Sequence, residues 1–163
     1  MLNVERRVNG DPTREIPLTD RGRQQARDLG YMVANTQFDV CIHTRFPRTA
    51  ETAAIALTER AIPMNVEPLF DDVDIGELEG KLIDEYRAWK HEHSRSDPFP
   101  GGESLDDVAR RYLRGFEGLL ERSETSLLAV VHEIPNAVPY LFDERGLERA
   151  IAGIERLVGR VPA

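Results

Sequence analysis

The sequence contains a single cysteine, Cys41, and no excess of positive charge. One cysteine cannot form an internal disulfide, so a disulfide-stapled fold is excluded and a reducing compartment is expected. The net charge of −8 argues against general binding to nucleic acid or to anionic membranes, because both need a basic face. A phosphorylated ligand stays open, since a few arginines in a cleft can hold an anion on an acidic protein.

Long apolar runs are also missing. No stretch approaches the ~20 apolar residues of a membrane-spanning helix, and the first residues lack the apolar core of a signal peptide. We therefore expect a cytoplasmic protein with no membrane and no nucleic-acid partner. The 163 residues are 40% hydrophobic and 31% charged, which suits a globular fold with one substantial core. Without a repeat, linker or low-complexity segment, residues 1–163 are expected to form a single domain.

Patterns typical of strands alternate with patterns typical of helices along most of the chain. This alternation predicts an α/β fold with a largely parallel sheet. Thr19 is a predicted N-cap, and Ser104-Leu-Asp-Asp resembles a capping box. Strands are expected at 38–43, 66–70, 127–131 and 138–142, and helices at 20–34, 48–60, 82–93, 104–120 and 144–158.

Three short segments carry the most specific information: Arg48-Thr-Ala-Glu-Thr-Ala, Asp72-Val-Asp-Ile-Gly-Glu-Leu-Glu-Gly and Pro100-Gly-Gly-Glu-Ser. In this order and at these spacings they resemble the histidine phosphatase (phosphoglycerate mutase-like) superfamily. Residues 16–22 resemble the segment on the carboxyl side of that family's Arg-His-Gly-Glu signature. The resemblance implies a three-layer α/β sandwich with a mostly parallel sheet and helices on both faces. It also implies phosphatase or phosphomutase activity through a phosphohistidine, with no metal or other cofactor and with a small phosphorylated substrate or phosphate as ligand.

Arg48 follows the first expected strand, at the point where a helix begins. In an open α/β sheet, ligands bind beyond the carboxyl ends of the strands. A guanidinium suits a phosphoryl group because its planar fork meets two oxygens at once. By resemblance Arg48 would bind the substrate phosphate, with Thr49 in place of the family's first alanine; Arg45 is a weaker candidate. The alternative is a solvated arginine paired with Glu51 or Glu59.

Asp72 is the candidate acid for the leaving group, which phosphomonoester hydrolysis needs beside a nucleophile and phosphate donors. It lies four residues before Gly76, where the family carries a glutamate that acts as general acid and base. Aspartate is one methylene shorter. Asp71 and Asp74 flank it, and such close carboxylates would raise one another's pKa values, which suits an acid. The alternative is an acidic loop or a cation site.

His132 follows the apolar run 127–131, and Val-Val-His-Glu-Ile-Pro resembles the family's second histidine segment. That histidine would donate to the transferring phosphoryl group. Pro135 and Pro139 disfavour the helix that comes next in the family. Either an internal deletion joins this strand to the family's last strand, or His132 belongs to the later segment. A structural histidine is the remaining alternative.

Asn3, Asn9 and Gly10 match positions where the family contacts the substrate phosphate, although Asn and Gly also mark ordinary turns. His91 and His93 are two residues apart on an expected helix and point to different faces. No metal site is therefore expected there.

The Arg-His-Gly-Glu signature does not occur in the sequence. Three hypotheses remain: a family member whose gene model begins too late, a non-catalytic module that keeps Arg48 as a phosphate anchor, and an unrelated acidic α/β scaffold. In the family the signature's strand is central in the sheet. Its loss would leave a gap with open strand edges, which favours association into a homo-oligomer.

Overall fold

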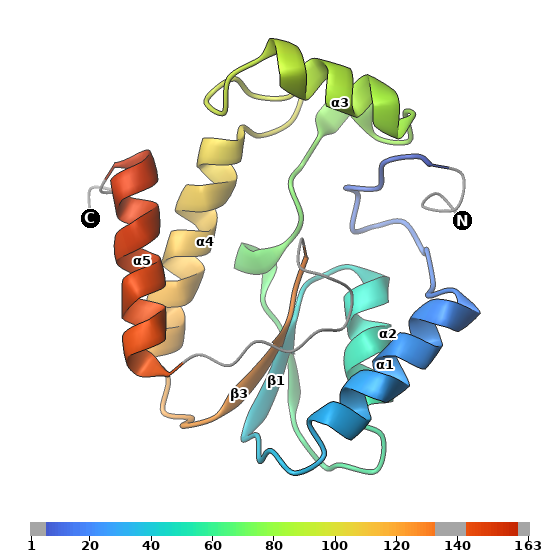
Figure 1. Cartoon of the computed structure of the whole chain (residues 1–163), viewed down its shortest axis with the longest axis vertical. Coiled ribbons are helices and arrows are strands. Elements are labelled where there is room, and N and C mark those ends of the chain that lie inside the picture. Colours follow the sequence, from blue (N-terminus) through green and yellow to red (C-terminus); the bar gives the residue numbers. More distant parts are fainter. Residues whose placement is uncertain (1–5, 133–142, 160–163) are drawn as a thin grey trace.

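The structure is a computed structural model in which residues 6–132 and 143–159 are described (Figure 1). Its three parallel strands are arranged in the order β2-β1-β3. The middle strand β1 (Val40–His43) is buried along its whole length. It pairs with β2 (Met64–Val66) on one side and with β3 (Leu127–Val130) on the other, so these three strands form one continuous sheet.

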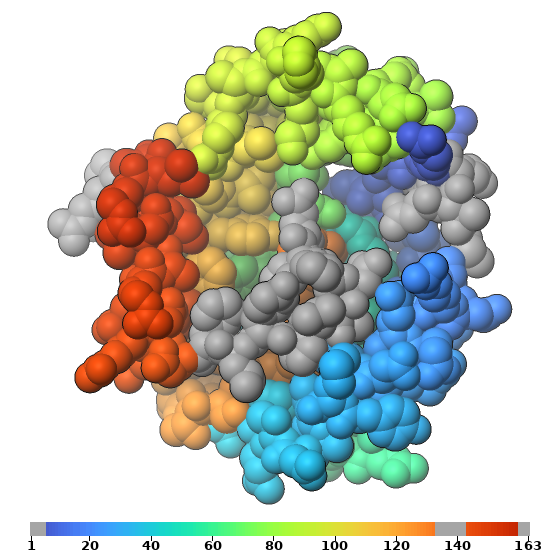
Figure 2. Space-filling model, viewed as in Figure 1, coloured from blue at the N-terminus to red at the C-terminus, as the bar shows by residue number. Residues whose placement is uncertain are grey.

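Helices flank this sheet on both sides, which confirms the α/β fold expected from the sequence (Figure 1). The helices α1 and α2 pack together on one side, and α4 and α5 pack together on the other. In the space-filling view α3 forms one end of the molecule, and the segment after α1 forms the opposite end (Figure 2). The bounds are α1 (Asp20–Met32), α2 (Pro47–Ala56), α3 (Ile83–Glu92), α4 (Leu105–Leu120) and α5 (Glu144–Val158). None of the helices in the described ranges is long and apolar enough to cross a membrane.

Local capping chemistry sets where the helices begin. Thr19 Oγ1 accepts a hydrogen bond from the backbone N of Gly22 at 3.0 Å, as its position as N-cap predicted. The capping box at α4 is also confirmed: Ser104 and Asp107 each accept from the other's backbone N at 3.1 Å. These caps satisfy backbone donors that the first helical turn leaves free.

Two elements depart furthest from the sequence prediction. The second strand occupies Met64–Val66, earlier than the expected 66–70, because Pro68 lacks an N–H and begins the 3-10 turn η1 (Pro68–Phe70). The second helix ends at Ala56, short of residue 60. Glu59 has a φ of 69°, a left-handed conformation that no right-handed helix can continue through. The strand expected at 138–142 lies outside the described residues.

The buried apolar side chains form separate clusters. One lies between the sheet and α2, with Cys41, Ala53 and Val130 among its members. Another lies under α3 and joins loop residues far apart in the sequence: Val8, Val73, Ile75 and Phe99. This second cluster is the support for the loops that surround the carboxyl ends of the strands.

Candidate functional site

Arg48, Asp72 and His132 meet at the carboxyl ends of β1 and β3. Nη2 of Arg48 donates to Asp72 Oδ2 at 3.0 Å and lies 3.2 Å from His132 Nδ1. The same nitrogen is 3.4 Å from the backbone oxygen of Asn9. His132 Nδ1 and Asp72 Oδ2 are 3.7 Å apart. Three residues singled out in the sequence as anion-binding or catalytic candidates are therefore brought into one cluster.

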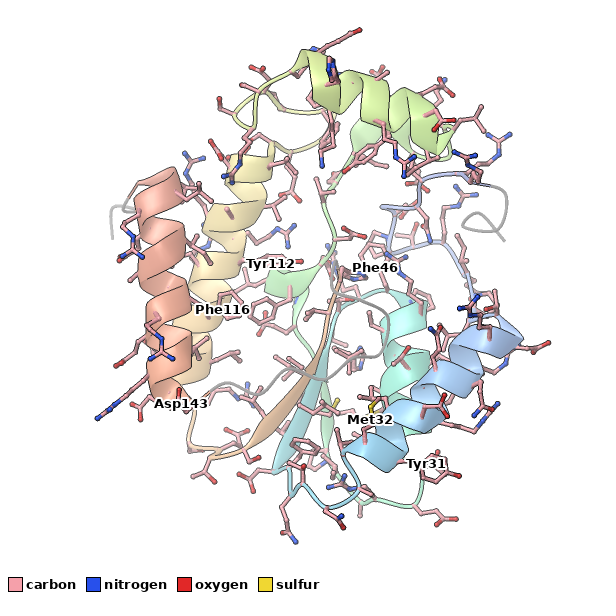
Figure 3. The ribbon with its side chains drawn as sticks, viewed as in Figure 1. Tyr31, Met32, Phe46, Tyr112, Phe116 and Asp143 are labelled. Atoms are coloured by element: carbon pink, nitrogen blue, oxygen red, sulfur yellow. The ribbon has the colours of Figure 1, made fainter. Side chains whose placement is uncertain are left out.

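Phe46 packs against two members of this cluster, and nothing in the sequence marked it for that position. Its ring, which is labelled in Figure 3, packs edge-on against the His132 imidazole with centroids 4.6 Å apart. The guanidinium carbon of Arg48 lies 4.2 Å from the centroid of the same ring, a cation–π contact. Phe46 is 1% exposed, so it is a rigid platform for both side chains.

His132 is neutral at physiological pH. Burial lowers its pKa from 6.5 to about 3, and the positive charges of Arg48 and Arg111 act in the same direction. On its other side, His132 Nε2 lies 2.8 Å from Thr44 Oγ1. Burial also raises the pKa of the Cys41 thiol to about 11, so that residue offers no thiolate nucleophile at neutral pH.

A cavity of about 590 Å³ opens beside the cluster, and Asp72 and Phe46 form part of its wall. Its charged lining is mainly acidic: Asp11, Asp71, Asp72, Asp74, Glu79 and Glu103 face Arg45 and Arg111. Since Arg48 is already paired with Asp72, a phosphoryl group would have to displace that carboxylate or find it protonated. An anion at Arg48 would therefore compete with the Asp72 carboxylate.

The alternative in which Arg48 is a solvated arginine paired with Glu51 is not what the structure shows. The Glu51 carboxylate instead accepts from Arg23 at 2.9 Å and from the backbone N of Leu18 at 2.7 Å. The Arg48 side chain is only 21% exposed and turns toward Asp72.

The three neighbouring aspartates do not share one environment. Asp71 accepts from the backbone N of Arg45 at 2.8 Å and from its guanidinium, whereas Asp72 pairs with Arg48. Asp74 accepts from a backbone amide two residues further on, at 2.9 Å. Within the described ranges there is no group of three or more His, Cys, Asp or Glu side chains placed to hold a metal ion.

The N-terminal candidates contribute mainly through the backbone. Gly10 lines the cavity, but its N–H already donates to Glu79 Oε2 at 2.7 Å. A side chain at Gly10 would collide with the carbonyl oxygen of Val73, which a Cβ would approach to 2.8 Å. The Oδ1 atom of Asn9 is buried and has no hydrogen-bond partner among the described residues. Asn3 lies outside those residues.

Arg111 is a site residue that the sequence reasoning missed. From α4, its Nη1 donates to the carbonyl oxygens of Leu69 and Asp71, both at 2.9 Å. Its Nη2 donates to the carbonyl oxygen of Asp72 at 3.3 Å and to the Glu103 carboxylate. Arg111 thus holds the backbone that presents Asp72. The only sequence signal for this role was the position of Arg111 beside the apolar stripe of the helix predicted at 104–120.

A family model described as "Histidine phosphatase superfamily (branch 1)" matches residues 1–140. The "Probable phosphoglycerate mutase GpmB" of Salmonella choleraesuis is 29% identical over 140 residues, which cover 81% of this chain and 64% of that protein. The chain therefore spans less than two thirds of the length of this relative.

Solved structures show the same fold. The alpha-ribazole phosphatase of Shigella flexneri superimposes with a TM-score of 0.71 at 25% identity, over 81% of this chain and 68% of that chain. YhfR of Bacillus stearothermophilus gives a TM-score of 0.70 at 30% identity, over 80% and 67%. A mycobacterial glucosyl-3-phosphoglycerate phosphatase, in complex with VO3, gives 0.69 at 19% identity, over 93% and 74%, and shows the fold alone.

Proposed function

Because the chain belongs to the histidine phosphatase superfamily, we propose that it acts on a phosphomonoester whose phosphoryl group binds at Arg48. The observation that carries this proposal is the cluster of Arg48, Asp72 and His132 at the carboxyl ends of two parallel strands. Family membership also removes the hypothesis of an unrelated scaffold.

In the proposed reaction, the phosphoryl group replaces Asp72 as the partner of Arg48. The guanidinium then neutralises the phosphoryl oxygens, a type of preorganised charge stabilisation that is commonly the largest catalytic term. Once released from Arg48, the Asp72 carboxylate takes up a proton from solvent. It passes this proton to the leaving oxygen as the nucleophile forms its bond to phosphorus and the bond between phosphorus and the leaving oxygen breaks. The resemblance assigns the nucleophile to the histidine of an Arg-His-Gly-Glu segment, which does not occur in residues 1–163. The described residues supply the anion-binding and proton-transfer groups.

The cavity indicates the class of substrate. A volume of about 590 Å³ suits a small molecule. The acidic lining beyond Arg48 disfavours a second phosphate and favours a leaving group that carries hydroxyls or positive charge. The relatives named for phosphoglycerate and alpha-ribazole phosphate supply the first substrates to assay. The proposal includes a metal-independent reaction and a cytoplasmic location.

A second candidate is a non-catalytic phosphate-binding module. The Arg48–Asp72 ion pair at 3.0 Å favours it, because an arginine with a carboxylate partner is stable without substrate. An aspartate in place of the family's glutamate also shortens the reach of the acid.

Binding of inorganic phosphate or vanadate, followed by NMR titration, tests the role of Arg48. One guanidinium with few partners supports an affinity in the millimolar range, about 4 kcal/mol. We expect Arg48→Ala to weaken binding at least tenfold. Arg27→Ala, on the exposed face of α1, is the matched control and should bind as the parent does. Equal affinities for the parent and Arg48→Ala would remove Arg48 from the role.

Asp72→Asn separates the two candidate functions. It removes the carboxylate that competes for Arg48, so phosphate should bind several-fold more tightly. If the site is catalytic, the same substitution should lower turnover in a chain that contains the nucleophile segment. Tighter phosphate binding with unchanged turnover would remove Asp72 from the acid role, and tighter binding with no turnover in either protein would leave the binding-module hypothesis.

A further inference from the structure

A buried chain of hydroxyl groups connects His132 to the start of α2. His132 Nε2 lies 2.8 Å from Thr44 Oγ1, and Thr44 Oγ1 lies 2.8 Å from Thr49 Oγ1. Thr49 Oγ1 lies in turn 2.8 Å from the carbonyl oxygen of Phe46. Thr44 is 0% exposed, Thr49 5% and His132 9%, so water has little access to this chain. The direction of each hydrogen bond can therefore be assigned from the protons that the two threonine hydroxyls and the imidazole carry.

The count starts at the carbonyl end. The Phe46 carbonyl oxygen accepts from the backbone N of Thr49 at 3.0 Å and of Ala50 at 3.3 Å, and the Thr49 hydroxyl lies closer still, at 2.8 Å. Since a carbonyl oxygen only accepts, we assign the single hydroxyl proton of Thr49 to this short contact. Its other carbonyl contact, Thr44 O at 3.3 Å, requires the same direction. With this assignment Thr49 Oγ1 accepts from Thr44, which uses the only hydroxyl proton of Thr44. Thr44 Oγ1 is left as an acceptor, and the proton of its bond to His132 belongs to Nε2.

The opposite side of the imidazole leads to the same assignment. Arg48 Nη2 lies 3.2 Å from His132 Nδ1. A guanidinium has no acceptor atom, so Nδ1 must present its lone pair. Asp72 Oδ2 lies 3.7 Å from His132 Nδ1. Arg48 Nη2 contacts both of these atoms, so its positive charge lies between the Nδ1 lone pair and the carboxylate. A pKa of about 3, lowered by burial and by the charges of Arg48 and Arg111, keeps this form neutral.

We propose that Thr49 is a positioning residue that acts through Thr44 to hold the proton of His132 on Nε2 and direct its Nδ1 lone pair toward Arg48. Thr49 stands where the family pattern has an alanine, so the relay is a property of this chain. Its consequence for the reaction rests on the proposed function. His132 meets the phosphoryl group as an acceptor and becomes a donor only after Nδ1 takes up a proton.

Thr49 decides the tautomer more strongly than Arg48 does. Without the Thr49 hydroxyl, the fully buried Thr44 hydroxyl loses its acceptor, and His132 Nε2, 2.8 Å away, can take its place. A buried donor left without an acceptor is costly. Arg48 is partly exposed and keeps Asp72 as a partner when it moves away from Nδ1. Removing the Thr49 hydroxyl should therefore transfer the proton to Nδ1.

The tautomer can be measured without substrate, in the full chain labelled with 15N-histidine. Two-bond 1H–15N correlation spectra at neutral pH distinguish a protonated Nε2 from a protonated Nδ1. The parent and Thr49→Ser should show protonated Nε2, and Thr49→Val should show more than half protonated Nδ1. Thr52→Val is the matched control, because the Thr52 hydroxyl donates to the carbonyl oxygen of Arg48 at 2.8 Å on the same helix. It should leave the His132 signals unchanged.

A parent protein with protonated Nδ1 would overturn the proposal, and so would a Thr49→Val protein that keeps the parent pattern. An equal shift in Thr52→Val would assign the effect to the helix as a whole and overturn the role of Thr49. If Thr49→Val fails to fold, Thr49→Ala replaces it and should show the same shift of the proton to Nδ1. Alanine is the residue that the family pattern has at this position. Because no phosphate is used, these outcomes leave the phosphate-binding test of Arg48 independent.

Discussion

At the scale of single residues, the buried neutral imidazole of His132 makes stability depend on pH. In the unfolded chain the imidazole takes up a proton below its ordinary pKa of 6.5, whereas in the folded protein its pKa is about 3. Between these values the unfolded state binds more protons, so the free energy of unfolding falls as the pH falls. The limiting slope is about 1.4 kcal/mol per pH unit.

The variant His132→Gln should lack this pH dependence, because its amide nitrogen can donate to Thr44 but does not titrate. We expect the stability of the parent relative to this variant to fall between pH 6.5 and about 3, with a slope approaching about 1.4 kcal/mol per unit. Urea denaturation at a series of pH values measures it. Parallel stability curves for the two proteins would show that His132 is not held neutral by the fold.

At the scale of elements, two loops are locked together to form the wall of the cavity. The backbone N of Glu77 donates to Pro100 O at 2.8 Å, and that of Glu103 donates to Asp74 O at 2.9 Å. The Glu103 carboxylate also accepts from the backbone N of Asp74 at 3.0 Å. The Pro-Gly-Gly-Glu-Ser segment, which contains the helix cap Ser104, is therefore also a clamp on the loop that carries Asp72.

Glycine at position 102 permits this close approach. A Cβ there would lie 2.3 Å from the carbonyl oxygen of Asp74, and that contact is with backbone that cannot easily move. We expect Gly102→Ala to lower the free energy of unfolding by about 1–3 kcal/mol, the usual cost of overpacking. Thermal or urea unfolding measures the effect.

Gly118→Ala is the control for that substitution. Gly118 lies within α4 and a Cβ there would meet nothing within 4 Å. Alanine should raise stability by about 0.5–1 kcal/mol, because glycine is unfavourable inside a helix. A Gly102→Ala protein as stable as the parent would mean that the two loops are not clamped.

At the scale of the whole molecule, the catalytic capacity of the 163-residue chain should be low. The family mechanism passes through the histidine of the Arg-His-Gly-Glu segment, which these residues do not include. Removal of a covalent nucleophile costs orders of magnitude in rate. We expect turnover of p-nitrophenyl phosphate far below that of a family enzyme that contains the segment. Comparable turnover that is abolished by His132→Ala would show that a different nucleophile is in use.

The edge strand β2 makes self-association a further expectation for this chain. All three residues of β2 are exposed, with Met64 at 43% and Val66 at 53%. An exposed apolar edge invites pairing with a second copy. Sedimentation at increasing concentration should show association that Val66→Lys weakens, whereas Tyr31→Lys, on an exposed residue of α1, should not. A monomer that melts cooperatively above the usual range of ~45–65 °C would contradict this expectation.

The sequence alone determined the features that depend on neighbouring residues. The alternation of strands and helices, the N-cap at Thr19 and the capping box at Ser104 follow from local periodicity and local hydrogen bonds, and the structure confirms them. The placement of Arg48 at the start of α2, after β1, is also local. These features are readable because their partners lie within a few residues of each other.

The tertiary structure decided which of these residues act together. Arg48 and His132 are 84 positions apart, and Thr44 and His132 are 88 positions apart, so no periodic pattern in the sequence predicts either contact. The choice of Asp72 rather than Glu51 as the partner of Arg48 depends on how the loops pack over the second apolar cluster. Contacts of this kind form only when folding brings distant segments together. The neutral state of the His132 imidazole follows from the same burial.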